Sequence, residues 1–391
     1  MSKTNLALLQ PVDALYSSFK GLYRTGLLGW INMLRATQKK DPVDFPAVGA
    51  TQQEVVWQKG AVRLIRYGGE GERKTPLLIV PSLINRHYIL DLLPERSVVR
   101  GLRAAGLDVY VLDWGSALPA DRNNGLAHYA LRLLPEAAER IGRPAHVMGY
   151  CMGGTLALGA IATGKLDALS LVAMATPVDC DHGGILTSWT RTESFKAGEL
   201  VEGFGNVPAY ILQPAFKMMD PMGLVQKFVH AQQKVTDDNF CRFFLAMETW
   251  LEDNVPFPGR AFQEWIEDVY KNNAVMRGTW KLDGERVDLS KVRCPVLSIV
   301  AEEDYICPPR ASDGMMARIG STDKETIRMP GGHIGLTTGS SAQKNLWPRV
   351  AKWLLQRAEP PRPTTPASST TTTSKPPRAR AAGGNKRRAS A

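Results

Sequence analysis

Short apolar runs alternate with longer stretches of helical periodicity through most of the chain. Six of these runs are rich in aliphatic residues and are bounded by turn-forming residues. They cover residues 76–81, 107–113, 145–150, 169–175, 295–301 and 325–329. Continuous apolar runs of this length are typical of strands that are covered on both faces. The alternation therefore predicts an α/β fold, with a mostly parallel sheet and helices on both of its faces.

Two segments depart from this rhythm. Residues 54–67 indicate a hairpin that turns at Lys59 and Gly60 and adds antiparallel edge strands to the sheet. Residues 181–291 have helical periodicity and many Met and aromatic residues, which indicates a helical cap over the carboxyl edge of the sheet. We expect most of these large side chains to form the core of the cap and a few to line an access path. They are Phe204, Tyr210, Phe216, Met218, Met219, Met222, Phe228, Phe243, Phe244, Trp250 and Trp265.

The pattern divides the chain into five parts. We expect an N-terminal helical segment over residues 1–50, an α/β core over 51–180 and 292–357, the cap over 181–291 and a tail over 358–391. The tail contains no Leu, Ile, Val, Phe or Trp. It cannot bury enough apolar surface to offset the entropy of ordering, so we predict that it is disordered.

The charge of the chain is concentrated in the tail. A net charge of +10 over 391 residues would suggest a nucleic-acid partner. The tail, however, holds seven basic residues and one acidic residue, a net charge of +6, so the other 357 residues carry only +4. The basic character therefore belongs to the tail, and we expect no nucleic-acid binding outside it.

Cysteine usage points to a cytosolic protein. The five cysteines are an odd number without a CxxC pair, which is typical of a reduced compartment. We interpret four of them, Cys180, Cys241, Cys294 and Cys307, as small core residues. No apolar run approaches the roughly 18 residues of a membrane span, and no export signal follows Met1. We therefore expect the protein to begin near Met1 and to remain in the cytoplasm.

The sequence GYCMGG places Cys151 between the apolar run 145–150 and a helical stretch. Gly-x-nucleophile-x-Gly at a strand-to-helix turn is the nucleophile elbow of α/β-hydrolases, in which small residues permit a tight turn that exposes one side chain. The N-terminus of a helix also favours a thiolate. A buried structural cysteine would leave the flanking glycines unexplained. The pattern therefore predicts an α/β-hydrolase fold with Cys151 as its nucleophile.

A thiol nucleophile needs a base, and the base needs an orienting acid. In this fold the three residues occur in the chain order nucleophile, acid, histidine. His333 lies in the segment PGGHIG after one predicted strand, and Asp304 follows another. Both positions are at strand ends, where open α/β sheets place their sites. Glu302 and Glu303 compete with Asp304 for the role of the acid, and we favour Asp304.

The fold also supplies an oxyanion hole from two backbone N–H groups. We expect one to belong to Met152, directly after the nucleophile, and the other to Ile84, in the loop after the run 76–81. Most other histidines are interpreted as structural and have no partner at metal-ligand spacing, so we predict no metal site. These are His128, His146, His182 and His230.

Together these motifs resemble those of the polyhydroxyalkanoate synthases. The resemblance covers about residues 50–357. It is carried by PSLINRHYILDL at residues 81–92, LDVYVLDWG at 107–115, GYCMGG at 149–154 and PGGHIGL at 330–336, with further similarity in LDG at 282–284 and VDL at 287–289. A single elbow would be only a moderate signal, whereas this ordered set is specific.

The resemblance implies an acyltransferase that polymerises 3-hydroxyacyl-CoA thioesters into a storage polyester and releases CoA. Cys151 would carry the growing chain, His333 would activate nucleophiles, and Asp304 would orient His333 or help to activate the substrate hydroxyl. An apolar cap would keep water from the intermediate.

Because no long N-terminal domain precedes the core, the chain is similar to the shorter, two-component synthases. That similarity implies a separate small helical partner subunit, short-chain monomers such as 3-hydroxybutyryl-CoA, and a dimer or larger assembly. It also implies that the enzyme works at the surface of the polyester granule and needs no cofactor, since CoA leaves with the substrate.

Two residues depart from the family pattern, and two other functions stay open. Tyr305 follows Asp304 where the family usually has His, and His87 stands where the shorter synthases often have Pro. A cysteine-dependent hydrolase or thioesterase of the same fold would use the same three residues. A non-catalytic protein associated with granules or DNA would instead act through the basic tail.

Overall fold

The computed structural model describes residues 3–68 and 75–358, and it describes side chains from Leu15 onward. The predicted disorder and the positive charge of the tail concern residues 359–391, which lie outside the described part of the chain. Of the five predicted parts of the chain, the structure therefore describes the first four, apart from residues 1–2 and 69–74, and only Ala358 of the tail.

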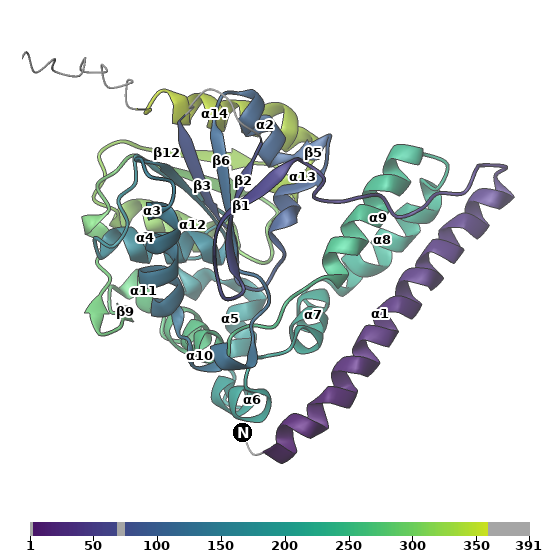
Figure 1. Cartoon of the computed structure of the whole chain (residues 1–391), viewed down its shortest axis with the longest axis horizontal. Coiled ribbons are helices and arrows are strands. Elements are labelled where there is room, and N and C mark those ends of the chain that lie inside the picture. The colour runs from purple at the N-terminus through teal and green to yellow at the C-terminus, as the bar shows by residue number, and fades with distance from the viewer. Residues whose placement is uncertain (1–2, 69–74, 359–391) are drawn as a thin grey trace, which may run out of the picture. The chain divides into compact units, whose positions relative to one another are not determined.

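Eight strands form one sheet in the order β1-β2-β6-β3-β7-β8-β11-β12 (Figure 1). Their bounds are β1 Gln53–Lys59, β2 Val62–Tyr67, β3 Pro76–Val80, β6 Asp108–Asp113, β7 His146–Tyr150, β8 Leu171–Met174, β11 Val296–Ala301 and β12 Lys324–Met329. The six strands from β3 to β12 are parallel, and β1 and β2 form an antiparallel hairpin at one edge. All six predicted strands and the predicted hairpin are confirmed. The hairpin turns at Gly60 and Ala61, one residue later than expected.

Alternate residues of the strands face two separate cores, as the two-residue period of a strand requires. On one face Leu78 and Val80 of β3 pack with Leu156 of helix α4 (Met152–Ala162). On the other face Leu77 and Ile79 pack with residues of α2 (Val98–Ala104) and α14 (Trp347–Leu355). The predicted parallel sheet with helices on both faces is therefore confirmed.

The chain between β8 and β11 is mainly helical, as the pattern predicted. Its helices include α5 Gly184–Thr190, α6 Ala197–Phe204, α7 Ala209–Met218, α8 Pro221–Gln233, α9 Asp238–Glu252, α10 Gly259–Glu264, the π-helix η5 Trp265–Lys271 and α11 Ala274–Arg277. The expected core position is wrong for Met218 of α7 and Met222 of α8, which are exposed by 67% and 64%. The last part of this region, with Trp280 and Leu282, packs on α4 beneath the sheet face.

The N-terminal helix α1 (Lys3–Thr37) is 35 residues long and runs beside α8 and α9 (Figure 1). Its buried face carries Leu27 and Ile31, which pack with Leu245 of α9. At its C-terminal end, buried Arg35 forms an ion pair with Asp238 at 2.7 Å. Helix α1 is therefore attached to the helical region by an apolar seam and by polar contacts.

Several short elements complete the fold. They are β4 Asp91–Leu93, β5 Arg96–Ser97, α3 Leu134–Glu139, β9 Lys281–Leu282, β10 Glu285–Arg286, α12 Pro309–Arg318, α13 Gly335–Thr338, the 3-10 helices η1 His87–Leu90, η2 Pro119–Asn123, η4 Cys180–His182 and η6 Leu289–Lys291, and the π-helices η3 His128–Leu133 and η7 Ala342–Leu346. None of the helices within the described residues combines the length and the apolar character that a bilayer crossing requires.

Candidate active site

Cys151 occupies a sharp turn between β7 and α4. Its φ of 55° and ψ of −124° lie in a region that residues other than glycine rarely adopt. The small neighbours make the turn possible, since a Cβ on Gly149 would lie 2.3 Å from the Cα of Gly154 and a Cβ on Gly153 would lie 1.9 Å from the backbone oxygen of Val80. The strained turn presents the half-buried thiol at the N-terminus of a helix, in the geometry of a nucleophile elbow.

His333 and Asp304 come together from two different loops. The Nδ1 atom of His333 lies 2.6 Å from Oδ2 of Asp304, and both side chains are buried. The other carboxylate oxygen, Oδ1, accepts the backbone N–H groups of Ile306 and Cys307 at 2.8 Å each. Because both oxygens are engaged, the carboxylate is held in one orientation and fixes the ring of His333.

The two competing acids of this loop lie elsewhere. Glu302 forms an exposed ion pair with Arg328 at 3.2 Å. Glu303 is exposed, and its backbone N–H donates to the oxygen of Gly331. The structure therefore brings Asp304, rather than either glutamate, into contact with His333.

The surroundings of His333 stabilise its charged form. Burial disfavours the imidazolium, but the charge of Asp304 and the interaction with the Cys151 thiol outweigh burial and raise the pKa of His333 to about 10. The ring of Tyr150 stacks on the imidazole with the centroids 5.0 Å apart. A protonated imidazole next to the thiol favours a thiolate and imidazolium pair.

The two proposed oxyanion donors lie in neighbouring segments. In the register of the parallel strands, Val80 of β3 pairs with Gly149 of β7, so the loop after β3 reaches the elbow. Ile84 and Met152 both line the cavity that contains Cys151. Within the described residues, neither backbone N–H donates a hydrogen bond to another protein group, which leaves both free for an oxyanion.

Two tryptophans hold the loop that carries Ile84. Trp114 donates its indole N–H to the backbone oxygen of Pro81 at 2.8 Å, and Trp250 donates to the oxygen of Arg86 at 2.9 Å. The loop is thus fixed at both ends, once by the DWG segment that follows β6 and once by α9. A fixed loop keeps its N–H groups aimed at one place, which is what preorganised stabilisation of an oxyanion needs.

His87 directly follows the loop that carries Ile84, and it pairs with a residue at the end of β6. Its Nδ1 atom lies 3.1 Å from Oδ1 of Asp113, and both side chains are buried. Burial alone would raise the pKa of Asp113, but His87, Arg63 and the backbone N–H of Gly115 together lower it well below its usual range. The departure from the family pattern at this position therefore adds a buried polar pair to the fold.

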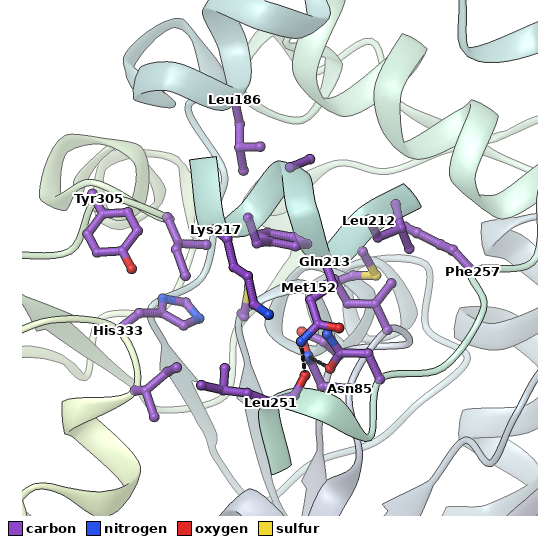
Figure 2. A pocket seen from close by; sticks show the side chains of 18 of the residues that line it. Asn85, Met152, Leu186, Leu212, Gln213, Lys217, Leu251, Phe257, Tyr305 and His333 are labelled. Atoms are coloured by element: carbon purple, nitrogen blue, oxygen red, sulfur yellow. Dashed lines mark hydrogen bonds between the residues drawn. The ribbon is translucent and has the colours of Figure 1, made fainter. Parts of the chain in front are cut away.

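A cavity of about 420 Å³ extends from Cys151 into the helical region, and its lining is mostly apolar. The imidazole of His333 and the side chain of Lys217 both project into it, with Tyr305 beside His333 (Figure 2). Large apolar side chains from the helical region form much of the wall. They are Leu186, Trp189, Phe195, Leu200, Ile211, Leu212, Phe216, Leu224, Trp250, Leu251, Phe257, Phe262, Trp265 and Ile266.

Three basic residues also line this cavity, and each is paired with an acid. Two of the acids, Glu248 and Glu252, are buried in α9. The pairs are Lys217 with Glu252 at 2.9 Å, Lys227 with Glu248 at 2.7 Å and Arg86 with Asp253 at 3.4 Å. Gln213 of α7 donates to the backbone oxygen of Leu251 (Figure 2). It also donates to Glu252, so that Gln213 joins α7 to α9 beside the cavity.

Sequence reasoning did not find several residues of this site. Tyr150 precedes Cys151 directly, and its place in the GYC segment could have suggested a contact with the site. Gln213 and Lys217 carry no local signal, because they reach the cavity only through the packing of α7 on α9. The other cysteines are buried at Cys180, Cys241 and Cys307, whereas Cys294 is half-buried.

Among the described residues, no histidine other than His333 lines the cavity that contains Cys151. His146 is buried and interacts with Ser170 at 2.8 Å, and burial lowers its pKa to about 4. His182 lies 3.1 Å from Asp179 on the surface. Across residues 3–68 and 75–358, no group of three or more His, Cys, Asp or Glu side chains could hold a metal ion.

Comparison with known proteins identifies two overlapping families. The alpha/beta hydrolase family matches residues 82–343, and the N-terminal region of poly-beta-hydroxybutyrate polymerase matches residues 34–102. Among solved structures, a soluble variant of monoglyceride lipase from Saccharomyces cerevisiae is similar, with a TM-score of 0.50 and 14% identity over 81% of this chain and 98% of that chain. This likeness supports the fold alone.

Curated relatives narrow the family. The chain is 37% identical to the poly(3-hydroxyalkanoate) polymerase subunit PhaC of Haloarcula marismortui, over 83% of this chain and 71% of that protein. It is 36% identical to the subunit of the same name from Haloferax mediterranei, over 85% of this chain and 69% of that protein. It is 34% identical to the subunit of the same name from Allochromatium vinosum, over 79% of this chain and 90% of that protein. The chain therefore belongs to the family of the poly(3-hydroxyalkanoate) polymerase subunits, which are acyltransferases with the α/β-hydrolase fold.

Proposed function

We propose that this chain polymerises a short-chain 3-hydroxyacyl-CoA, such as 3-hydroxybutyryl-CoA. The reaction would pass through an acyl-Cys151 thioester and release CoA. The observation that carries the proposal is the assembly of Cys151, His333 and Asp304 at one end of a largely apolar cavity. A cysteine suits this reaction, because exchange of one thioester for another is nearly balanced in energy. The acyl group remains activated for the next transfer.

The first half of the reaction loads the enzyme. The Cys151 thiolate attacks the carbonyl carbon of the thioester, and the oxyanion accepts hydrogen bonds from the N–H groups of Met152 and Ile84. The bond from the carbonyl carbon to the CoA sulfur then breaks, and the imidazolium of His333 supplies the proton that CoA takes away. The products are an acyl-Cys151 thioester, free CoA and a neutral His333.

The second half extends the chain. Neutral His333 removes the proton of the 3-hydroxyl group of another hydroxyacyl unit, and the resulting alkoxide attacks the acyl-Cys151 carbonyl. An ester bond forms, the carbon–sulfur bond breaks, and Cys151 leaves as a thiolate paired with the His333 imidazolium. The site is then ready for another thioester.

Of the two roles left open for Asp304, its contacts favour the orienting one. Both carboxylate oxygens already accept hydrogen bonds, and the side chain is fully buried behind His333. Asp304 does not line the cavity in which the substrate hydroxyl would have to lie. It would therefore act by fixing the tautomer and the direction of His333.

The apolar lining supports polymerisation over hydrolysis. A thioester intermediate survives between additions only if water is kept away, and a wall of Leu, Ile, Phe and Trp side chains offers water few partners. The same lining would accommodate aliphatic ester units. We also propose that the enzyme works at the granule surface, where such a chain would accumulate, and together with a small helical subunit.

The decisive experiment measures CoA release from 3-hydroxybutyryl-CoA by wild type and by Cys151→Ala, with and without the small subunit, and then extracts the product with organic solvent. We expect Cys151-dependent release and extractable polyester. The hydrolase alternative predicts the same release with only soluble hydroxy acid. Release that persists in Cys151→Ala would overturn the assignment of the nucleophile. Cys180→Ala serves as the matched control, because Cys180 is buried and lies outside the cavity lining.

A further inference from the structure

Helix α1 exposes an apolar stripe with a regular spacing. Leu15, Phe19, Leu22 and Met33 are exposed by 71%, 62%, 71% and 59%. Gly26 and Gly29 complete the stripe and are also exposed. The six positions are separated by four and three residues in turn, which is the heptad spacing of a helix that packs along a second helix.

The opposite face of α1 is occupied by its own chain. Tyr16 donates to Gln213 at 2.9 Å, and Tyr23 donates to buried Glu248 at 2.6 Å. Leu27 and Ile31 are buried in the seam with α8 and α9. The stripe is therefore the free side of a helix whose other side is already docked.

The charges of α1 lie away from the stripe. Among its described side chains the charged ones are Lys20, Arg24 and Arg35. Arg24 donates to Thr249 at 3.3 Å and Arg35 pairs with Asp238, so both are directed at the chain's own helices. Lys20 lies over the ring of Tyr16 at 4.9 Å. A second helix could approach the stripe without meeting a like charge.

The glycines have no explanation within the chain. A Cβ added at Gly26 or Gly29 would meet nothing within 4 Å. Glycine in the interior of a helix is nevertheless unfavourable compared with alanine. A second helix that brings a large side chain to each glycine would explain both positions.

The order of large and small residues is complementary to itself. In an antiparallel pair of α1 helices related by a two-fold axis level with Arg24, residues at equal distances from that position meet. Leu22 then faces Gly26 of the other copy and Phe19 faces Gly29, while Leu15 meets Met33. Each pair occurs twice, as a two-fold interface requires. A second copy of this chain supplies the complementary order at every one of these positions.

We propose that two copies of this chain associate through an antiparallel pairing of their α1 helices, with Phe19 and Leu22 inserted over Gly29 and Gly26. The pairing buries the exposed stripe of both copies. It does not depend on the polymerase reaction, because the stripe carries no residue of the cavity lining.

The test exchanges a large residue and a small residue across the pair. In Phe19→Gly, a glycine faces Gly29; in Gly29→Phe, two aromatic rings collide. Both single variants are expected to weaken the dimer by roughly ten-fold or more, as measured by analytical ultracentrifugation of the full chain. The double variant restores one Phe–Gly contact on each side, and we expect it to recover the wild-type dissociation constant within about three-fold.

The design separates pairing from other effects. Phe19→Gly and the double variant both place a glycine at position 19, so recovery in the double variant cannot come from a change at that position. Leu355→Glu, which changes an exposed leucine on α14, is the matched control and should leave the dimer intact. Circular dichroism verifies that each variant keeps the helix content of the wild type.

Three outcomes would overturn the proposal. One is a wild-type chain that stays monomeric, including one that associates only when a helical partner protein is added. Another is a dimer that neither single variant weakens. A third is tighter association of Gly29→Phe, which is the behaviour of a general apolar patch that gains surface.

Discussion

The ring of Tyr150 stacks on the imidazole of His333, with 26° between the ring planes, and its hydroxyl donates to the backbone oxygen of His333 at 3.2 Å. One residue, placed directly before Cys151, therefore contacts both the ring and the backbone of His333. Burial raises the pKa of Tyr150 well above its usual value, so the hydroxyl keeps its proton and remains a donor.

Two substitutions of Tyr150 separate the effect of its hydrogen bond to His333 from the effect of its stacked ring. Tyr150→Phe keeps the stacked ring and removes one hydrogen bond, which should cost about 1 kcal/mol of stability and only a few-fold in turnover. Tyr150→Leu also removes the ring and should cost about 2 kcal/mol or more. We expect a much larger loss of turnover for Leu than for Phe in CoA-release assays. Equal losses would mean that the ring does not position His333.

Asp304→Asn should lower turnover by roughly 100-fold or more, because an amide can donate to Nδ1 of His333 and stabilise the wrong tautomer. The matched control is Glu302→Gln on the same loop. Glu302 pairs with Arg328 at the surface, and its loss should change turnover by less than two-fold, or about 0.4 kcal/mol. CoA release and thermal unfolding should be measured together. If the two variants lose activity equally, Asp304 has no special role.

The raised pKa of His333 predicts a pH-dependent stability. The folded-state value of about 10 lies above the unfolded value of about 6.5. The contribution of His333 is therefore fully present below about pH 6.5 and is lost as the pH rises through about 10. The difference in unfolding free energy between wild type and His333→Gln should fall in this range by at most about 1.4 kcal/mol per pH unit. Denaturant titrations at several pH values measure it, and a difference that grows with pH would contradict the sign.

The lowered pKa of Asp113 has the opposite consequence. Its contribution is fully present above the unfolded value of about 3.9, and it is lost gradually as the pH falls from there through the much lower folded-state pKa. Asp113→Asn should destabilise the fold by roughly 1 to 3 kcal/mol at neutral pH, because His87 and Arg63 lose a charged partner.

The difference in stability between Asp113→Asn and wild type should narrow as the pH falls below about 3.9, and it should close only as the pH passes through the lowered folded-state pKa. Unfolding of both proteins at pH 7 and at pH 3 tests this expectation. Asp121→Asn is a suitable comparison, since Asp121 caps an exposed turn and faces no buried base. A difference that persists unchanged at pH 3 would show that the carboxylate charge of Asp113 is not the cause.

Gly153→Ala should unfold the elbow or the whole protein, since the new Cβ would lie 1.9 Å from the backbone oxygen of Val80. We expect a loss of more than about 3 kcal/mol, as for severe overpacking. Gly203→Ala, in the helix α6, meets nothing within 4 Å and should stabilise the protein by up to about 1 kcal/mol. Thermal unfolding compares them, and similar midpoints for the two variants would refute the packing argument.

The parts of the site that the sequence predicts are those whose constraints are local. Cys151 is recognisable because the turn that exposes it excludes a Cβ at Gly149 and Gly153. His333 is recognisable because it follows a strand within a glycine-rich loop. Asp304 was one of three adjacent acids, and only the packing of its loop against His333 distinguishes it from the others.

The helical region was less predictable for a physical reason. Its periodicity predicts helices, but it does not say which helix covers which. Met218 and Met222 resemble core residues in the sequence, yet they are exposed. Lys217 resembles a surface residue, yet it projects into the cavity, where Glu252 neutralises it. Such positions depend on contacts between residues that are distant in the sequence.

The pairing of each basic residue in the cavity wall with its own acid has a consequence for movement. A polyester chain is uncharged along its length, and the three paired basic residues offer no unbalanced positive charge to hold its carbonyl groups at one place. In the proposed polymerisation, a long neutral chain would therefore move along this wall without having to break an ionic contact with these residues.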